Sequence, residues 1–385
     1  MSTSPRLPPE LCDYIIDKLR NQPNALKTCS VVSKSWTARS RKHIFSTICF
    51  NGDPDVVAWR NAFPDASNSP AHHARTLVVN HRKGFPENRL SSFCNVTRLF
   101  LHVHPVDGCL VSLTQLHGFT PSLKSLHMTF PILPFSDVLS LVYSFPLLDD
   151  LLLTGIPMAS DTKVTPSKPP KFSGSLCLAV FREMRIMANH LLSLPSGIHF
   201  RELILPWICD QDMPSMMDLI SACSHTLESL HVLNHTKRMR FHSLLRVLPR
   251  LTLSVEGNTR HSLDLSSALN LKSVVFRCGM PSLNVDWITI AVESIKSSHV
   301  KEMTLYMPGN LTTRGNVDAQ LPDAVYTQWL DLDKVFVEYL TARSFKLKVV
   351  TSPGTDKDTF EGYVERLLPN LFEKKMLEMA QILRA

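Results

Sequence analysis

The chain has 385 residues, of which 44% are hydrophobic and 19% charged, and its net charge is +7. This composition excludes wholesale disorder and supplies enough apolar material for one large domain or several smaller ones. Nine cysteines without any C-x-x-C pair argue against a disulfide framework and against a cysteine zinc site.

The first residues bear on where the protein works. "MSTSPRLPPE" holds no apolar stretch of the kind found in signal peptides. No apolar run approaches the roughly 20 residues that a membrane span needs. Scattered cysteines without a pairing pattern are typical of reduced thiols. We therefore expect a cytoplasmic or nuclear protein, or one found in both compartments, with no membrane partner.

Residues 7–19, LPPELCDYIIDKL, predict a helix. It is expected to begin at the two prolines, because proline in the first turn loses no hydrogen bond. Leu11, Ile15 and Leu19 then recur at the spacing of one helical face, with Ile16 beside them. The Asn-Gln-Pro sequence that follows is expected to end this helix.

Two more short helices are expected before residue 48. The second covers 24–31 and is expected to bury Leu26, Cys29 and Val32. Ser33 is a candidate N-cap for the third helix, which carries Trp36. Three such helices hold too few apolar residues to form a stable domain alone. Something else, either a partner or the rest of this chain, is expected to complete their core.

The basic charge is concentrated in this opening unit. The first 50 residues hold eight Lys or Arg against three Asp or Glu, a balance of +5. The remaining residues contribute only +2. A nucleic-acid stripe usually extends further and carries exposed aromatic residues. We therefore expect no nucleic-acid partner, and an acidic protein partner fits at least as well.

The segments "LPPELCDYIIDKL", "CSVVSKSW" and "RKHIF" occur in this order at the N-terminus. Together they resemble the F-box, most closely the version common in fungal F-box proteins, over residues 5–48. The resemblance implies docking on a Skp-type adaptor, and through it on a cullin-based SCF ubiquitin ligase. It also implies which residues form or support the docking surface: Leu7, Pro8, Leu11, Ile15, Ile16, Val32 and Trp36. The alternative is a helical cap that packs only on its own chain.

A second pattern, L-x-x-L-x-L with other apolar residues allowed, recurs from about residue 75 onward. It is found at 74–79, 96–101, 123–128, 148–153, 173–178 in part, 200–205, 227–232, 248–253, 271–276 and 300–305. Its middle apolar residues lie at 77, 99, 126, 151, 176, 203, 230, 251, 274 and 303. A period in the twenties around a short strand is the mark of leucine-rich repeats.

Helix-like stretches lie between the strand motifs, for example at 135–145, 213–225 and 326–340. A strand and a helix per repeat build an α/β solenoid with short parallel strands. The chain therefore resembles F-box proteins of the leucine-rich-repeat type, with irregular repeats. The expected domains are an F-box at 5–48, a connecting segment at 49–74, repeats over 75–350 with a final strand at 345–350, and a C-terminal helical cap at 351–385, broken or kinked at Pro369. An unrelated α/β domain with chance strand motifs is the competing interpretation.

The residues that alternate with the buried leucines face solvent on such strands. They form a mixed, moderately apolar row that suits a protein surface better than a phosphate backbone. An unknown protein substrate is therefore expected at Phe100, His102, His127, Leu152, Ile204, His231, Arg277 and Tyr306. The loop at 159–174, rich in Pro, Ser and Lys, is the main rival site.

No catalytic pattern is found, and the chain is not expected to be an enzyme. It lacks the phosphate-binding glycine loops, the H-E-x-x-H motif and the G-x-S-x-G motif. His102 and His104 share a strand face, and His72 and His73 lie in sequence, but neither pair has a third ligand nearby. No metal and no cofactor are expected. The expected function is that of a substrate adaptor in the ubiquitin conjugation pathway. A leucine-rich-repeat scaffold without a ubiquitin role is the alternative.

Overall fold

The computed structural model describes residues 8–65, 68–81, 92–103, 122–158, 170–180, 184–205, 213–233, 263–278, 285–307, 321–351 and 356–381. The chain divides into two compact units, residues 1–171 and residues 172–385. Each unit combines helices with strands, and the strand pairs described within each are parallel. The predicted α/β class with parallel strands is confirmed. In the described ranges, no helix has the length and apolar character that a membrane crossing requires.

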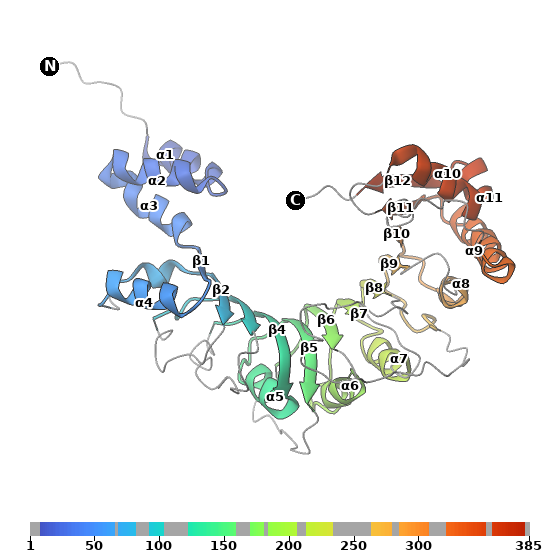
Figure 1. The fold of residues 1–385 in the computed structure, drawn as a ribbon, viewed down its shortest axis with the longest axis horizontal. Coiled ribbons are helices and arrows are strands. Elements are labelled where there is room, and N and C mark those ends of the chain that lie inside the picture. Colours follow the sequence, from blue (N-terminus) through green and yellow to red (C-terminus); the bar gives the residue numbers. More distant parts are fainter. Residues whose placement is uncertain are drawn as a thin grey trace. The chain divides into compact units, whose positions relative to one another are not determined.

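Three short helices open the first unit: α1 (Pro9–Lys18), α2 (Pro23–Val32) and α3 (Lys34–Ile44) (Figure 1). Helix α1 begins at the predicted prolines, and Ser33 caps α3 by accepting a hydrogen bond from the Ser35 N–H. Helices α1 and α2 both pack on α3. The apolar side chains that this three-helix bundle buries are Ile16, Leu26 and Cys29.

The segment predicted as a connection, 49–74, contains regular elements. They are strand β1 (Thr47–Phe50), helix α4 (Asp53–Ala62) and the 3-10 helix η1 (Pro70–His73). Strand β1 pairs with β2 (Thr76–His81), so the parallel strands begin before residue 75. Trp59 of α4 joins an aromatic cluster, with its ring centroid 6.0 Å from those of Phe45 and Phe50. Residues 45–50, FSTICF, match the apolar form of the motif with Phe45, Ile48 and Phe50, and Ile48 pairs with Leu77. The sequence analysis missed this strand because it recognised the pattern only from about residue 75 onward.

Strands β2, β3 (Arg98–Val103), β4 (Ser125–Pro134) and β5 (Asp150–Met158) continue the sheet of the first unit in chain order. Helix α5 (Phe135–Tyr143) follows β4 and packs on it, as predicted. The register of β4 and β5 shifts between Phe130 and Ile132. Gly155 lies opposite this irregularity, and a Cβ there would stand 2.0 Å from the Phe130 carbonyl oxygen. Only glycine fits this close approach.

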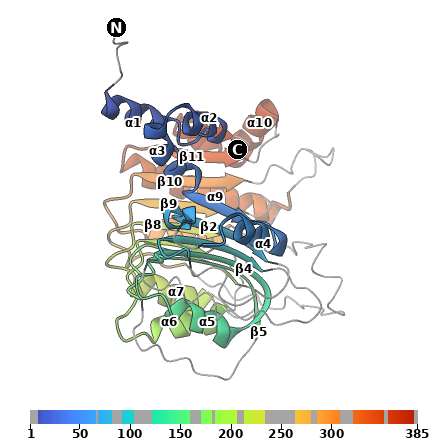
Figure 2. The ribbon, with the colours of Figure 1, turned by 90° about the vertical axis from the view of Figure 1, so that its left-hand side faces the viewer.

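The second unit repeats the arrangement, and Figure 2 shows β8 to β11 side by side. Helices α6 (Met184–Leu192), α7 (Met213–Ala222), α8 (Asp286–Ser294) and α9 (Asp323–Thr341) lie along one side of its strands (Figure 1). The strands are β6 (Ser175–Val180), β7 (Glu202–Leu205), β8 (Ser229–Leu233), β9 (Ser273–Arg277), β10 (Glu302–Met307), β11 (Leu347–Thr351) and β12 (Leu377–Gln381).

The middle residues of the predicted motifs align across the strands. Leu77 pairs with Leu99, Leu99 with Leu126, and Leu126 with Leu151 in the first unit. In the second unit the same row runs through Leu176, Leu203, Leu230, Val274 and Met303. Leu230 pairs directly with Val274, so β8 and β9 are neighbours. The motif 248–253 itself lies outside the described residues.

The C-terminal end is only partly the helical cap that was expected. Helix α10 (Lys357–Leu367) ends before Pro369, and α11 (Pro369–Glu373) begins there, as the proline predicts. The Asp333 carboxylate of α9 is fully buried and accepts hydrogen bonds from the Asn370 and Leu371 N–H groups at 2.8 and 3.0 Å. Residues 377–381 are strand β12, because their backbone pairs with β11. A helix there was the wrong prediction.

Candidate functional site

The three-helix bundle exposes several of its large apolar side chains. Leu11 and Ile15 lie one turn apart on α1 and are 49% and 41% exposed. Val32, at the end of α2, is 62% exposed, although the sequence pattern placed it in the core. Leu26 and Cys29 are the residues that α2 buries instead. Tyr14 on α1 and Val31 on α2 are also exposed, and the sequence analysis did not name them as surface residues.

The residues implied by the F-box resemblance therefore divide into two groups. Pro8, Leu11, Ile15 and Val32 are exposed and can touch a partner. Ile16 is fully buried and Trp36 is half-buried, so these two support the surface from inside. Leu7 lies outside the described residues. Exposed apolar side chains that lie together, as Leu11 and Ile15 do on α1, mark protein interaction sites.

The Asp17 carboxylate links α1 to α3. Asp17 of α1 accepts hydrogen bonds from Arg39 Nε at 2.8 Å and pairs with His43 Nε2 at 2.7 Å, both on α3. The hydrogen bond from Arg39, and then that from His43, holds the Asp17 pKa well below its usual range. This fixes the orientation of α1, and with it the direction in which Leu11 and Ile15 point.

The predicted substrate row is present on the sheet of the first unit. Phe100, His127 and Leu152 are paired neighbours on adjacent strands and are half-buried. The Phe100 and His127 rings meet edge to face with centroids 4.4 Å apart. His102 pairs with Thr129 one step along the same face. His104 and the rival loop at 159–169 lie outside the described residues.

In the second unit the corresponding row is more charged. Ile204 pairs with His231, and His231 Nε2 lies 3.5 Å from Glu202 Oε1. Burial lowers the His231 pKa, while the Glu202 charge raises it. Arg277 stacks on the Tyr306 ring, 4.7 Å from its centroid. Thr304, which pairs with Val275 on this face, is buried, and Cys177 belongs to the row as the partner of Ile204.

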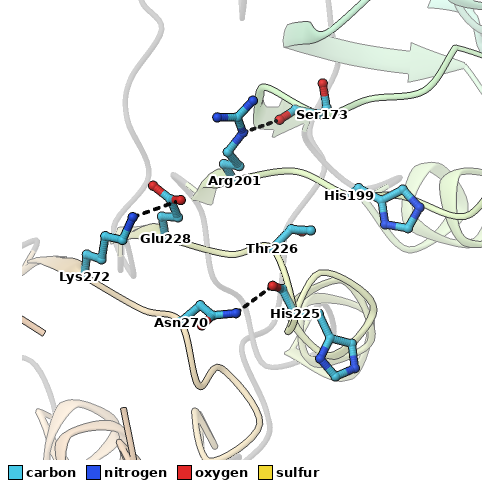
Figure 3. Close-up of a pocket in the computed structure, with 8 residues that line it drawn as sticks. All are labelled: Ser173, His199, Arg201, His225, Thr226, Glu228, Asn270 and Lys272. Carbon is cyan, nitrogen blue, oxygen red and sulfur yellow. Dashed lines mark hydrogen bonds and ion pairs between the residues drawn. The ribbon is translucent and has the colours of Figure 1, made fainter. Parts of the chain in front are cut away.

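A hollow of about 350 Å³ opens where the strands of the second unit begin. Its lining consists of Ser173, His199, Arg201, His225, Thr226, Glu228, Asn270 and Lys272 (Figure 3). These residues sit just before or at the start of β6 to β9. The sequence analysis did not single out any of them.

The polar groups of this hollow are already paired with the protein. Lys272 Nζ binds Glu228 Oε1 at 3.0 Å, and Asn270 Nδ2 donates to the His225 carbonyl at 2.7 Å (Figure 3). In the first unit, Asn95 Nδ2 donates in the same way to the His72 carbonyl at 2.9 Å. A polar residue directly before the first apolar position of the motif is thus a structural feature that ties one repeat to the previous one. This polar position before each motif is the sequence signal from which the lining of the hollow could have been predicted.

Three cysteines of the second unit are poor nucleophiles. Burial raises the pKa of the Cys177 and Cys223 thiols to about 11 and that of Cys278 to about 12, so these thiols stay protonated near neutral pH. No cluster of three metal-ligating side chains occurs among the residues described. The exposed apolar side chains on α1 and α2 are therefore the strongest candidate site. Compared with known proteins, the chain matches no family model and no curated sequence.

Proposed function

We propose that this chain is a substrate-recognition adaptor of an SCF-type ubiquitin ligase. Residues 5–48 dock on a Skp-type adaptor, and the repeated strand–helix units bind a protein substrate. The chain itself supplies proximity, since it holds substrate and ligase together and raises their effective concentration.

The exposed apolar side chains of the bundle carry this proposal. Leu11, Ile15 and Val32 are exposed in a bundle that buries few apolar groups of its own. Burying apolar surface contributes about 25 cal/mol per Å², so covering these side chains with a partner is favourable. The F-box resemblance of the sequence names the partner.

A charge placed on this surface tests the proposal. Leu11→Asp should abolish co-purification with a co-expressed Skp-type adaptor, because a carboxylate would be buried unpaired in the interface. Leu147→Asp is the matched control, since Leu147 is also a leucine in the first unit and is equally exposed at 49%. It should leave the capture unchanged.

Circular dichroism and thermal melting of both variants establish that the chain still folds. Failure of the folded wild-type chain to capture the adaptor would leave the alternative, a repeat scaffold whose helices only cap the strands. Deletion of residues 1–32, which removes α1 and α2 but keeps the contacts of Phe45 and Ser46, then separates the two. If the helices only cap the strands, the strands should lose stability, whereas an adaptor-binding bundle predicts a smaller change.

A further inference from the structure

A group of basic side chains lies where α3 meets η1 and where β2 begins. It consists of Arg41, Lys42, His72, His73 and Arg75, here called the basic cluster. Helix α3 contacts η1, and the Arg75 N–H donates to the Ser46 carbonyl at 2.8 Å. Burial lowers the His73 pKa, and the positive charges of the other four members lower it further. The five groups are therefore close enough to act on one another.

Local structure explains only part of the basic cluster. Arg41 and Lys42 lie in the last turn of α3, where cations interact favourably with the helix dipole. His72, His73 and Arg75 lie outside that helix and gain nothing from it. The two histidine rings nevertheless stack with centroids 3.9 Å apart, and Arg75 Nη1 donates to the Asn95 carbonyl at 3.1 Å. The fold thus brings the cations Arg41, Lys42 and Arg75 together with two histidines.

The basic residues of α3 differ in whether they have an acidic partner. Arg39 and His43 share the Asp17 carboxylate. Arg41 and Lys42, on the same helix, form no ion pair within the described ranges, and neither does Arg75. The charges that act on His73 are all positive. An anion from outside would offset this positive charge and would find three exposed cations: Arg41, Lys42 and Arg75.

The surroundings favour a protein as the source of that anion. Single-stranded nucleic acid is usually held by aromatic side chains that stack on bases. The aromatic rings nearest in the fold, Phe45, Trp59 and Phe63, pack against one another instead. Carboxylates match the fork of an arginine and the point charge of a lysine. We infer that the basic cluster is a docking surface for an acidic protein segment with several consecutive Asp or Glu residues.

This inference goes beyond the proposed function and uses none of the seven residues that the F-box resemblance assigns to the docking surface. The test is a titration of the full-length chain into a fluorescein-labelled peptide of about ten glutamates, followed by fluorescence anisotropy. Binding should weaken about tenfold or more when the salt rises from about 50 to about 200 mM. The triple variant R41A/K42A/R75A should bind the peptide at least about tenfold more weakly.

The triple variant K346A/K357A/K374A is the control, since it removes three exposed positive charges elsewhere and changes the net charge equally. It should alter binding by less than about twofold. Because Arg75 also bonds to Asn95, the double variant R41A/K42A provides a version that keeps this contact. It should weaken binding by about threefold or more.

Three results would overturn the inference. The first is a wild-type chain that does not bind the peptide. The second is an equal loss in the two triple variants, which would make net charge, and not this surface, responsible. The third is tighter binding of a single-stranded RNA of equal charge than of the peptide, which would replace the acidic protein with a nucleic acid.

Discussion

The three-helix bundle and the strands of the second unit treat the same residue types in opposite ways. Leu11 and Val32 of the bundle are 49% and 62% exposed, whereas Leu203 and Leu230 in the strands are completely buried. The strands bury one face because each pairs with its neighbours and is covered by helices. The bundle has one central helix and two that lean on it. The comparison teaches that apolar sequence alone does not locate the core; the number of packing neighbours does.

The largest effect is expected from the same substitution, leucine to alanine, made once in the strands and once in the bundle. Leu203→Ala should lower the free energy of unfolding by about 2–5 kcal/mol, because it opens a cavity in a closed core. Leu11→Ala should cost less than about 1 kcal/mol, because the side chain is half exposed. Urea denaturation monitored by circular dichroism measures both. Equal losses would break the comparison.

Two glycine-to-alanine substitutions extend the comparison of packed and unpacked positions to the backbone. Gly155→Ala should destabilise the first unit by about 3 kcal/mol, since the new methyl group would collide with the Phe130 carbonyl. Gly362→Ala is the control within helix α10, where no atom lies within 4 Å of the added carbon. It should be neutral or stabilising by about 0.5–1 kcal/mol. Thermal melting distinguishes them, and a stable Gly155→Ala chain would show that β4 and β5 can shift apart.

Two aspartates of α9, one buried and one exposed, test how much a buried hydrogen-bonded carboxylate contributes to stability. Asp333→Ala should cost about 2 kcal/mol, because it leaves the buried N–H groups of Asn370 and Leu371 unpaired. Asp331→Ala removes only an exposed contact with Lys334 and should cost less than about 0.5 kcal/mol. Hydrogen exchange at the start of α11 reports the difference directly. Unchanged protection in Asp333→Ala would mean that other groups cap α11.

The smallest effect concerns pH in the bundle. Because the folded Asp17 pKa is depressed, its contribution to stability is present above the ordinary value of 3.8 and is lost as the pH falls below it. Cleavage by pepsin within residues 8–44 should therefore increase at acidic pH before cleavage in the strands does. Arg39→Ala, which removes the main cause of the shift, should reduce this pH dependence. If the bundle resists pepsin as well as the strands do, Asp17 does not contribute to the stability of the bundle in this way.

The strands of the repeats were largely predictable, for a physical reason. Residues such as Leu126 and Leu203 must point to one face at a fixed period, and that requirement is written in the sequence. Strands β1 and β12 escaped for different reasons. The apolar residues Phe45, Ile48 and Phe50 fit the motif, but they lie before the region in which the pattern was recognised. In β12 a lysine, Lys374, stands at the first apolar position of the motif.

The candidate site was predictable in its residues but not in their roles. Helical spacing places Leu11 and Ile15 on one face, but it cannot say whether that face is covered. Ile16 lies one position away and is buried, and Val32 was expected inside but is exposed. The basic cluster could not be foreseen, because it joins residues about 30 positions apart through the contact of α3 with η1.

The hydrogen bonds at the strand starts have a consequence for how such a chain changes over evolution. In the second unit, the N–H groups of Lys272 and Ser273 both donate to the Glu228 carbonyl, just as those of Glu228 and Ser229 donate to Arg201. The alignment of β8 and β9 is therefore set locally, whatever the length of chain between them. Doubling a connection costs only about 0.6 kcal/mol in closure entropy. Insertions and deletions between strands are expected to accumulate freely, while the polar residues at the strand starts stay fixed in spacing from the leucines.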